Sequence, residues 1–248
     1  PKCCGLLAMA TSLQKARNEG YEGTVLLGHC TSLALQPDPS AVIAKLSFLS
    51  GVVVCANPTT NVGLQDRRGS TAPFSAAIPR DEPRTPRWRG ITLLQELRAA
   101  GVPVAAASDN VRDHWHPFGD YDVLCVLHSA VAIAHLDTAP TEGHWLDLVT
   151  TAPTRAVLGR TASDVAGFVA AGAKADLVLF PNARRASELL SRPQTDRVVI
   201  RRGALQRSQL PEYRVLDDLI QRKTTRTNLP GKSTAGTDDT AANLLKFK

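Results

Sequence analysis

Three stretches of the chain share one hydrophobic pattern: an amphipathic segment, then a glycine, then a short apolar run that ends at a polar residue. The amphipathic segments are residues 6–23, 39–51 and 90–101, and the apolar runs are residues 24–30, 52–58 and 102–110. Apolar positions at helical spacing, stopped by glycine, predict helices. Apolar runs without polar alternation are typical of parallel strands covered on both faces. The pattern therefore predicts an α/β fold.

The remaining segments carry weaker patterns. Residues 58–89 contain five prolines, which favours a long functional loop or an insertion over a helix. Residues 123–135 are apolar at helical spacing, and residues 141–159 read as two short helices, the second opened by Pro153. Residues 172–180 and 196–203 are short β-rich runs that we expect to form strands outside the parallel sheet.

Polar residues stand where each of the three apolar runs ends. They are His29, Asn57 and Asp109, the last within the run AAASDN. Parallel strands present their carboxyl ends at one edge of a sheet, so we expect these three residues on one face, with the side chains of His29 and Asp109 pointing into a shared cavity. A histidine can exchange protons near neutral pH, and a carboxylate after a buried strand needs a partner or a metal. For Asn57 the simpler interpretation stays open, that a loop begins there.

The other histidines have ordinary structural explanations. His114 and His116 flank Trp115 in a loop and can be solvated. Three more fall in predicted helices, where a structural role is the usual one: His128, His135 and His144.

Composition excludes several classes of protein. The chain has 248 residues, of which 43% are hydrophobic, and it lacks an apolar run of the roughly 20 residues that a membrane helix needs. Its net charge is +6, but residues 221–248 hold six basic and two acidic side chains, hence +4 of that charge. With only 5% aromatic residues, this distribution argues against nucleic-acid binding. Five cysteines without framework spacing favour a reducing, cytoplasmic location.

Several motifs in a fixed order resemble one family. They are GHCTSL, VVVCANPTTNVGLQDR, RGITLLQELRAAGVPVAAASDNVRDHWHPFGDYDVL, PTRAVLG, GAKADLVLF and DRVVIRRG. From about Cys4 to Leu216 the chain resembles the C-terminal half of bacterial-type cytosine deaminases of the amidohydrolase superfamily, hydrolases that act on C–N bonds other than peptide bonds. The resemblance implies a partial metal-dependent hydrolase (β/α) barrel with short C-terminal β-strands. It also implies a divalent metal, zinc or iron, and a place in pyrimidine metabolism.

The resemblance assigns roles to four residues. His29 matches the sixth-strand histidine that hydrogen-bonds the hydroxide on the metal or is itself a ligand, and Asp109 matches the eighth-strand acid that binds metal and moves protons. Asn110 stands where the family commonly has an aspartate that contacts the pyrimidine, and Trp115 matches an aromatic residue beside the base. Because an amide both donates and accepts, Asn110 leaves the preference for cytosine open.

The family's other metal ligands have no counterpart in this sequence. The first-strand H-x-H pair is absent, and the fifth-strand H-x-D-E motif would fall just before Pro1, so we expect the chain to be a piece of a longer protein. The leading hypothesis is a fragment of an enzyme that converts cytosine to uracil and ammonia, inactive in isolation. The alternatives are an amidohydrolase for a guanine-like or triazine-like ring, or a catalytically dead half-barrel.

The same resemblance predicts the domain organisation. Residues 1–170 would form the C-terminal half of the barrel, residues 171–216 a remnant of the family's composite β-sandwich, and residues 217–248 a disordered basic tail. Only three helix–strand units fit before Asp120, so the parallel sheet should be open. An open edge promotes self-association, which predicts poor solubility or a homo-oligomer. The expected binding partner is a small cytosine-like ring.

Overall fold

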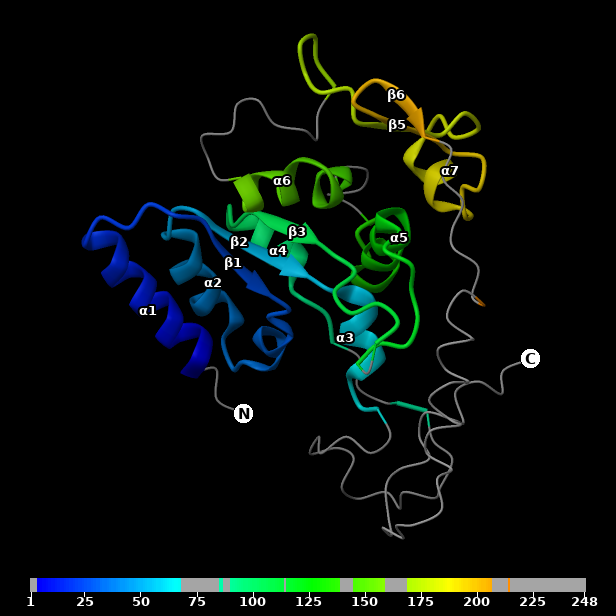
Figure 1. Cartoon of the computed structure of the whole chain (residues 1–248). Coiled ribbons are helices and arrows are strands. Elements are labelled where there is room, and N and C mark those ends of the chain that lie inside the picture. Colours follow the sequence, from blue (N-terminus) through cyan, green and yellow to red (C-terminus); the bar gives the residue numbers. More distant parts are fainter. Residues whose placement is uncertain are drawn as a thin grey trace, which may run out of the picture. The chain divides into compact units, whose positions relative to one another are not determined.

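The structure is a computed structural model of the chain. It describes residues 4–67, 85–86, 90–113, 115–138, 145–158, 169–206 and 214. A three-stranded parallel sheet organises the first part (Figure 1). Its strands, in spatial order, are β1 (Val25–Gly28), β2 (Val52–Ala56) and β3 (Val104–Ala106). Leu27 pairs with Val54, and Val54 pairs with Val104, so the carboxyl ends of the strands lie together. This confirms the predicted α/β class, and the described residues contribute three strands to the parallel sheet.

Each of the three predicted helix–strand units is present. The helices are α1 (Cys4–Asn18) before β1, α2 (Pro39–Ser47) before β2 and α4 (Leu94–Ala99) before β3. The side chain of Asp38 caps α2 by accepting a hydrogen bond from the Ala41 amide at 3.0 Å. Gly101, with φ 78°, ends α4: its amide bonds to the Arg98 carbonyl, and the Val102 amide bonds to the Leu97 carbonyl. Those two bonds form a Schellman motif, which explains the glycine at this place.

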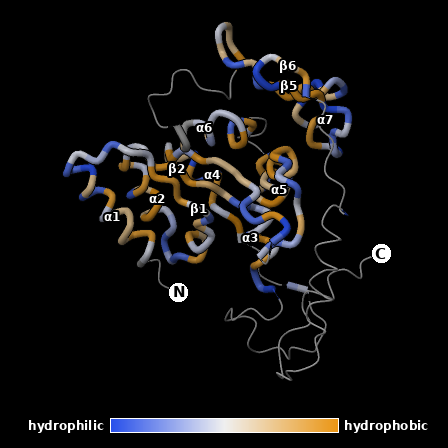
Figure 2. Tube along the Cα trace, in the orientation of Figure 1, coloured by the Kyte–Doolittle hydropathy of each residue, from blue (hydrophilic) through white to orange (hydrophobic). Residues whose placement is uncertain are grey.

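The parallel sheet is covered on both faces. Leu27, Val54 and Val104 point into the main hydrophobic core with residues of α1, α2 and α4. On the other face Val53, Cys55 and Ala105 form a smaller cluster with Ala152 and Ala156 of helix α6 (Thr151–Leu158). Every residue of β2 is buried, as its unbroken apolar run predicts. In Figure 2 these strands carry the colours of hydrophobic residues. The described residues do not form a closed barrel.

One predicted loop is partly a helix. Residues Pro58–Leu64 form α3, although the proline-rich segment 58–89 was expected to exclude helix. Pro58 occupies the first helical position, where a missing amide hydrogen costs nothing. The expectation was wrong because it weighed the number of prolines and not their position. Most of the remaining segment, residues 68–84 and 87–89, lies outside the described residues.

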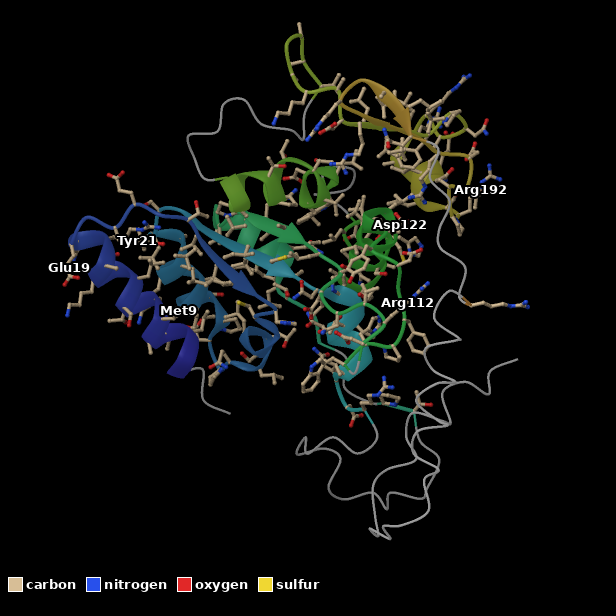
Figure 3. The ribbon with its side chains drawn as sticks, viewed as in Figure 1. Met9, Glu19, Tyr21, Arg112, Asp122 and Arg192 are labelled. Carbon is tan, nitrogen blue, oxygen red and sulfur yellow. The ribbon has the colours of Figure 1, made fainter. Side chains whose placement is uncertain are left out.

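Further helices follow the parallel sheet. α5 (Val123–Ala134) matches the apolar helix predicted there, and the 3₁₀ turn η2 (Leu146–Val149) with α6 matches the two predicted short helices. A second 3₁₀ turn, η1 (Thr31–Leu35), follows β1. The carboxylate of Asp122, which Figure 3 labels, caps α5. It also forms an ion pair with Arg197 at 2.7 Å. Burial opposes ionisation of Asp122, but its bonds to Arg197 and to the helix amides lower its pKa overall.

A second, antiparallel sheet lies farther along the chain. It consists of β4 (Leu177–Leu179), β5 (Val198–Arg201) and β6 (Ala204–Gln206), with α7 (Ala186–Leu190) between the first two strands. Strands in residues 172–180 and 196–203, outside the parallel sheet, were predicted and are confirmed. β6 was not predicted; it is joined to β5 by Arg202 and Gly203, both with positive φ, as a type I′ turn requires.

The chain divides into two compact units, Pro1–Gln206 and Arg207–Lys248. Of the second unit only Arg214 is described, so the prediction of a disordered tail falls outside the described residues. The predicted domain boundary near residue 170, the β-sandwich assignment and the homo-oligomer stay predictions. No helix among the described residues combines the length and apolar character that crossing a membrane requires.

Candidate functional site

The strand-end residues meet at one edge of the parallel sheet. His29 follows β1, Asn57 follows β2 and Asp109 lies three residues after β3. The Nε2 atom of His29 is 3.5 Å from Oδ2 of Asp109. The structure therefore brings together the two residues that the sequence selected, while their catalytic roles stay predictions.

The backbone around this pair is held in an uncommon conformation. His29, Cys30 and Asp109 have φ of 65°, 51° and 60°, in the left-handed region. Histidine and aspartate enter this region more readily than most residues, but such a conformation still costs of order 1 kcal/mol or more. Left-handed residues concentrate at functional sites because the surrounding fold can impose them. In this site, both residues of the pair, His29 and Asp109, have a left-handed backbone.

Two amides hold the imidazole of His29. Nδ1 lies 2.7 Å from Oδ1 of Asn61, a residue of α3 that is 5% exposed. The amide nitrogen of Asn57 lies 3.4 Å from both ring nitrogens, a distance that makes it a contact and not a strong hydrogen bond. Sequence analysis selected Asn57 but missed Asn61, whose position depends on a helix that was not predicted.

Helix α3 also restrains the segment after β3 that carries Asp109. The hydroxyls of Thr59 and Thr60 donate to the carbonyl of Ser108 at 3.4 and 3.1 Å. Thr92 donates to the carbonyl of His29 from the segment before α4. The backbone of both members of the pair is thus restrained by side chains from neighbouring elements, which favours a rigid site.

The carboxylate of Asp109 has an incomplete set of partners. Its Oδ2 atom is buried and has no hydrogen bond within the part of the chain that is described. A buried carboxylate oxygen without a donor is costly unless a cation or proton faces it. Nε2 of His29 lies 3.5 Å from Oδ2. An oxygen in this position is able to accept a bond from a proton or a cation.

The donor pair fits two positions of a metal site. Two ligands on one tetrahedral zinc ion lie about 3.4 Å apart, given bonds of about 2.1 Å. The observed separation of Nε2 and Oδ2 is 3.5 Å, and histidine nitrogen and carboxylate oxygen are both ordinary zinc or iron ligands. Among the described residues, however, no three His, Cys, Asp or Glu side chains are grouped to hold an ion. His29 and Asp109 therefore fit as a part of such a site.

Cys55 is a buried residue of β2 whose thiol is unreactive at neutral pH. Burial raises the pKa of its thiol to about 11, and the negative charge of Asp109 contributes in the same direction. Its sulfur contacts the Asn57 amide oxygen at 3.7 Å. Because the thiolate is the nucleophile and the metal ligand, a neutral Cys55 serves neither purpose at neutral pH.

The rate of alkylation should differ between Cys55 and Cys125, a residue that is exposed on α5. At pH 8 a thiol with a pKa near 11 has roughly a hundredfold less thiolate than an ordinary cysteine, and burial restricts access further. We expect iodoacetamide to modify Cys125 at least about a hundredfold faster than Cys55, as measured by mass spectrometry of peptides. In denaturant the two rates should become equal, and comparable rates in the folded chain would contradict the assignment.

The two expected substrate-binding residues lie in the loop before α5. The amide of Asn110 donates to Asp113, which also accepts from the backbone amides of Trp115 and His116 at 2.9 Å. The Asn110 hydrogen bond, followed by that of the His116 amide, lowers the pKa of Asp113. The side chain of Trp115 is 59% exposed. The loop is thus ordered around Asp113, while contact of Asn110 or Trp115 with a substrate stays a prediction.

The structure also places the other histidines. His116 is not simply solvated: its Nδ1 is buried, and it lies against Gly63 of α3, where an added Cβ would approach that atom to 3.1 Å. His128 lies on α5 and His135 caps its end, as expected for helical residues. His114 and His144 lie outside the described residues.

Comparison of the sequence with known families identifies the class of protein. The sequence profile of the amidohydrolase family matches residues 6–215, so the chain belongs to the amidohydrolase family. Over 206 residues it is 47% identical to a pterin deaminase from Rhizobium rhizogenes, an alignment that covers 81% of this chain and 42% of that protein.

Solved structures support the fold. The chain resembles 5-methylcytosine deaminase from Klebsiella pneumoniae, solved with 5-fluorocytosine, with a TM-score of 0.62 at 23% identity over 83% of this chain and 45% of that one. It also resembles N-isopropylammelide isopropylaminohydrolase from Burkholderia multivorans, with a TM-score of 0.57 at 23% identity, over 82% and 44% of the two chains. The chain thus spans less than half the length of the relatives that it matches.

Proposed function

We propose that this chain supplies part of the active site of a metal-dependent aminohydrolase that removes an amino group from a nitrogen heterocycle of the pterin type. The observation that carries the proposal is the buried Oδ2 of Asp109, without a hydrogen-bond donor and 3.5 Å from Nε2 of His29. Membership of the amidohydrolase family supports hydrolysis as the reaction class. The chain contributes two of the groups that the reaction needs, and the other metal ligands come from outside the described residues.

The reaction exchanges the amino group for oxygen. Water adds to the ring carbon that bears the amine, the C–N bond breaks, and ammonia leaves with a carbonyl in place of the amine. His29 and Asp109 would hold part of a zinc or iron site, and the ion would supply Lewis acidity there. Asp109 is placed to take a proton from the water and return it to the leaving nitrogen. His29, restrained by Asn61, contributes Nε2 as a donor atom of the metal site.

Pterin is favoured over cytosine as the substrate by the 47% identity to a pterin deaminase. The structural neighbours named for cytosine are 23–24% identical, and a likeness of that order supports the fold alone. Asn110 is compatible with this choice, since an amide can pair with the donor and acceptor edge of a fused lactam ring. Pterin and guanine share an amino-substituted pyrimidinone ring, so the expected guanine-like alternative is chemically close to the proposal.

Ammonia release tests the proposal. We would join the unmatched part of the Rhizobium relative to this chain and assay pterin, cytosine and guanine with the chimera and with the 248-residue chain alone. We expect the chimera to bind close to one metal ion and to deaminate pterin in preference to cytosine. The separate chain should bind metal weakly and release no ammonia, because its described residues include no group of three His, Cys, Asp or Glu side chains that could hold an ion.

Three results would contradict parts of this proposal. A chimera that prefers cytosine would restore the substrate expected from the sequence resemblance. A folded, metal-loaded chimera without activity on any of the three rings would favour a catalytically dead binding module. Deamination by the separate chain with stoichiometric metal would show that the ligand set given above is incomplete.

A further inference from the structure

We infer that Asn61 is a positioning residue that keeps the proton of neutral His29 on Nδ1 and so turns the lone pair of Nε2 toward Asp109. The inference deepens the proposed function, because it explains how the fold prepares this pair to share a cation. It rests on the proposed function only for what the pair binds. The tautomer itself follows from contacts within the chain.

The first step is the hydrogen bond between Asn61 and His29. Oδ1 of Asn61 lies 2.7 Å from Nδ1 of His29, and an amide oxygen can only accept. Nδ1 must therefore carry the hydrogen. A neutral imidazole has one N–H, so Nε2 is left with a lone pair.

Nε2 of His29 faces the carboxylate of Asp109. Oδ2 of Asp109 lies 3.5 Å away, is buried, and receives no hydrogen bond from the described residues. Two acceptor atoms thus face each other with no hydrogen between them. Such a pair is stabilised by a positive ion, and histidine ligands in metal sites commonly donate their other N–H to an oxygen acceptor in this way.

The burial of the Asn61 amide also points to a role for its oxygen. Asn61 is 5% exposed, and its Nδ2 is buried without a hydrogen-bond partner among the described residues. Burying that N–H group is unfavourable, and an apolar side chain would avoid the cost. The side chain therefore contributes through Oδ1, whose partner is His29. Asn57 does not set the tautomer, because its amide nitrogen lies 3.4 Å from both ring nitrogens.

Nuclear magnetic resonance of ¹⁵N-labelled chain, at a pH where the imidazoles are neutral, tests the inference without turnover. Protonated and unprotonated ring nitrogens have well-separated ¹⁵N shifts, and His29→Gln assigns the resonances. We expect Nδ1–H to exceed Nε2–H by roughly five- to tenfold in His29, the ratio that one ordinary hydrogen bond confers. Exposed His128 is the internal reference.

Two variants of similar size separate acceptor chemistry from packing. Asn61→Leu removes the acceptor and should abolish the excess of Nδ1–H, whereas Asn61→Asp keeps an oxygen at Nδ1 and should retain it. Zn²⁺ titrated into the unmodified chain should shift His29 Nε2, and Asn61→Leu should weaken that binding by roughly 10–100-fold.

The outcomes separate this inference from the proposed function. Predominant Nε2–H in the unmodified chain, or an Asn61→Leu variant with an unchanged tautomer ratio, would overturn the role of Asn61. If Asn61→Leu fails to fold, the unmodified chain and Asn61→Asp still decide the question. A correct tautomer without any zinc-induced shift would support the positioning role and count against the proposed metal site.

Discussion

Replacing Asp109 by asparagine in the chimera is expected to lower the rate of pterin deamination by roughly a thousandfold or more, because groups that hold and move protons at one centre act as a unit. The amide has nearly the shape of the carboxylate, but it carries no charge and accepts no proton at neutral pH. The measurement is kcat/KM for ammonia release together with the metal content of the purified variant. Both should fall.

The fold should survive this substitution. Oδ2 of Asp109 receives no hydrogen bond from the described residues, so removing its charge sacrifices little. An asparagine there can donate to Nε2 of His29 and relieve the unfavourable contact between two acceptors. We therefore expect an unchanged or raised thermal midpoint. Asp137→Asn, at an exposed position beyond α5, is the matched control and should leave the rate unaltered. An active Asp109→Asn chimera would remove Asp109 from the mechanism.

The sequence predicted those site residues that a local pattern marks. His29 and Asp109 were selected because each follows a buried apolar run, and parallel pairing of those runs necessarily brings their ends together. Asn61 is 32 residues from His29 along the chain, and no periodicity marks it. Its position depends on α3, which begins at Pro58 within a segment whose prolines argue against helix. The contact is a tertiary one and became visible only in the structure.

The elements of the fold, like the site residues, were predicted where local sequence patterns are strong and missed where they are weak. Three helix–strand units were predicted because each combines helical spacing, a glycine stop and an apolar run, signals that agree with one another. β6 was missed because its three residues, Ala204–Gln206, are all exposed and lack an apolar pattern. The turn before it places Arg202 and Gly203 at positive φ, and of these two residues only the glycine takes that conformation readily. The sequence therefore offered one weak signal for this strand.

The largest effect on stability is expected at Trp145. Its indole is 3% exposed in the main core, and the guanidinium of Arg98 lies 3.8 Å from the ring centroid. Arg98 also pairs with Asp147 at 2.8 Å, so one aromatic ring supports both packing and a cation. Trp145→Ala should lower the free energy of unfolding by about 3–5 kcal/mol, through lost burial and the cavity left behind. Urea denaturation followed by circular dichroism measures this loss.

Trp145→Phe is the control that separates the ring from its N–H group. Nε1 of Trp145 is buried without a hydrogen-bond partner in the described residues, so phenylalanine forfeits no such bond and still presents an aromatic face to Arg98. We expect it to cost less than about half as much as alanine. Equal losses for the two variants would show that the indole nitrogen has a partner that stabilises the fold. Because domains are stable by only about 5–15 kcal/mol, the alanine change alone should bring the chain close to unfolding.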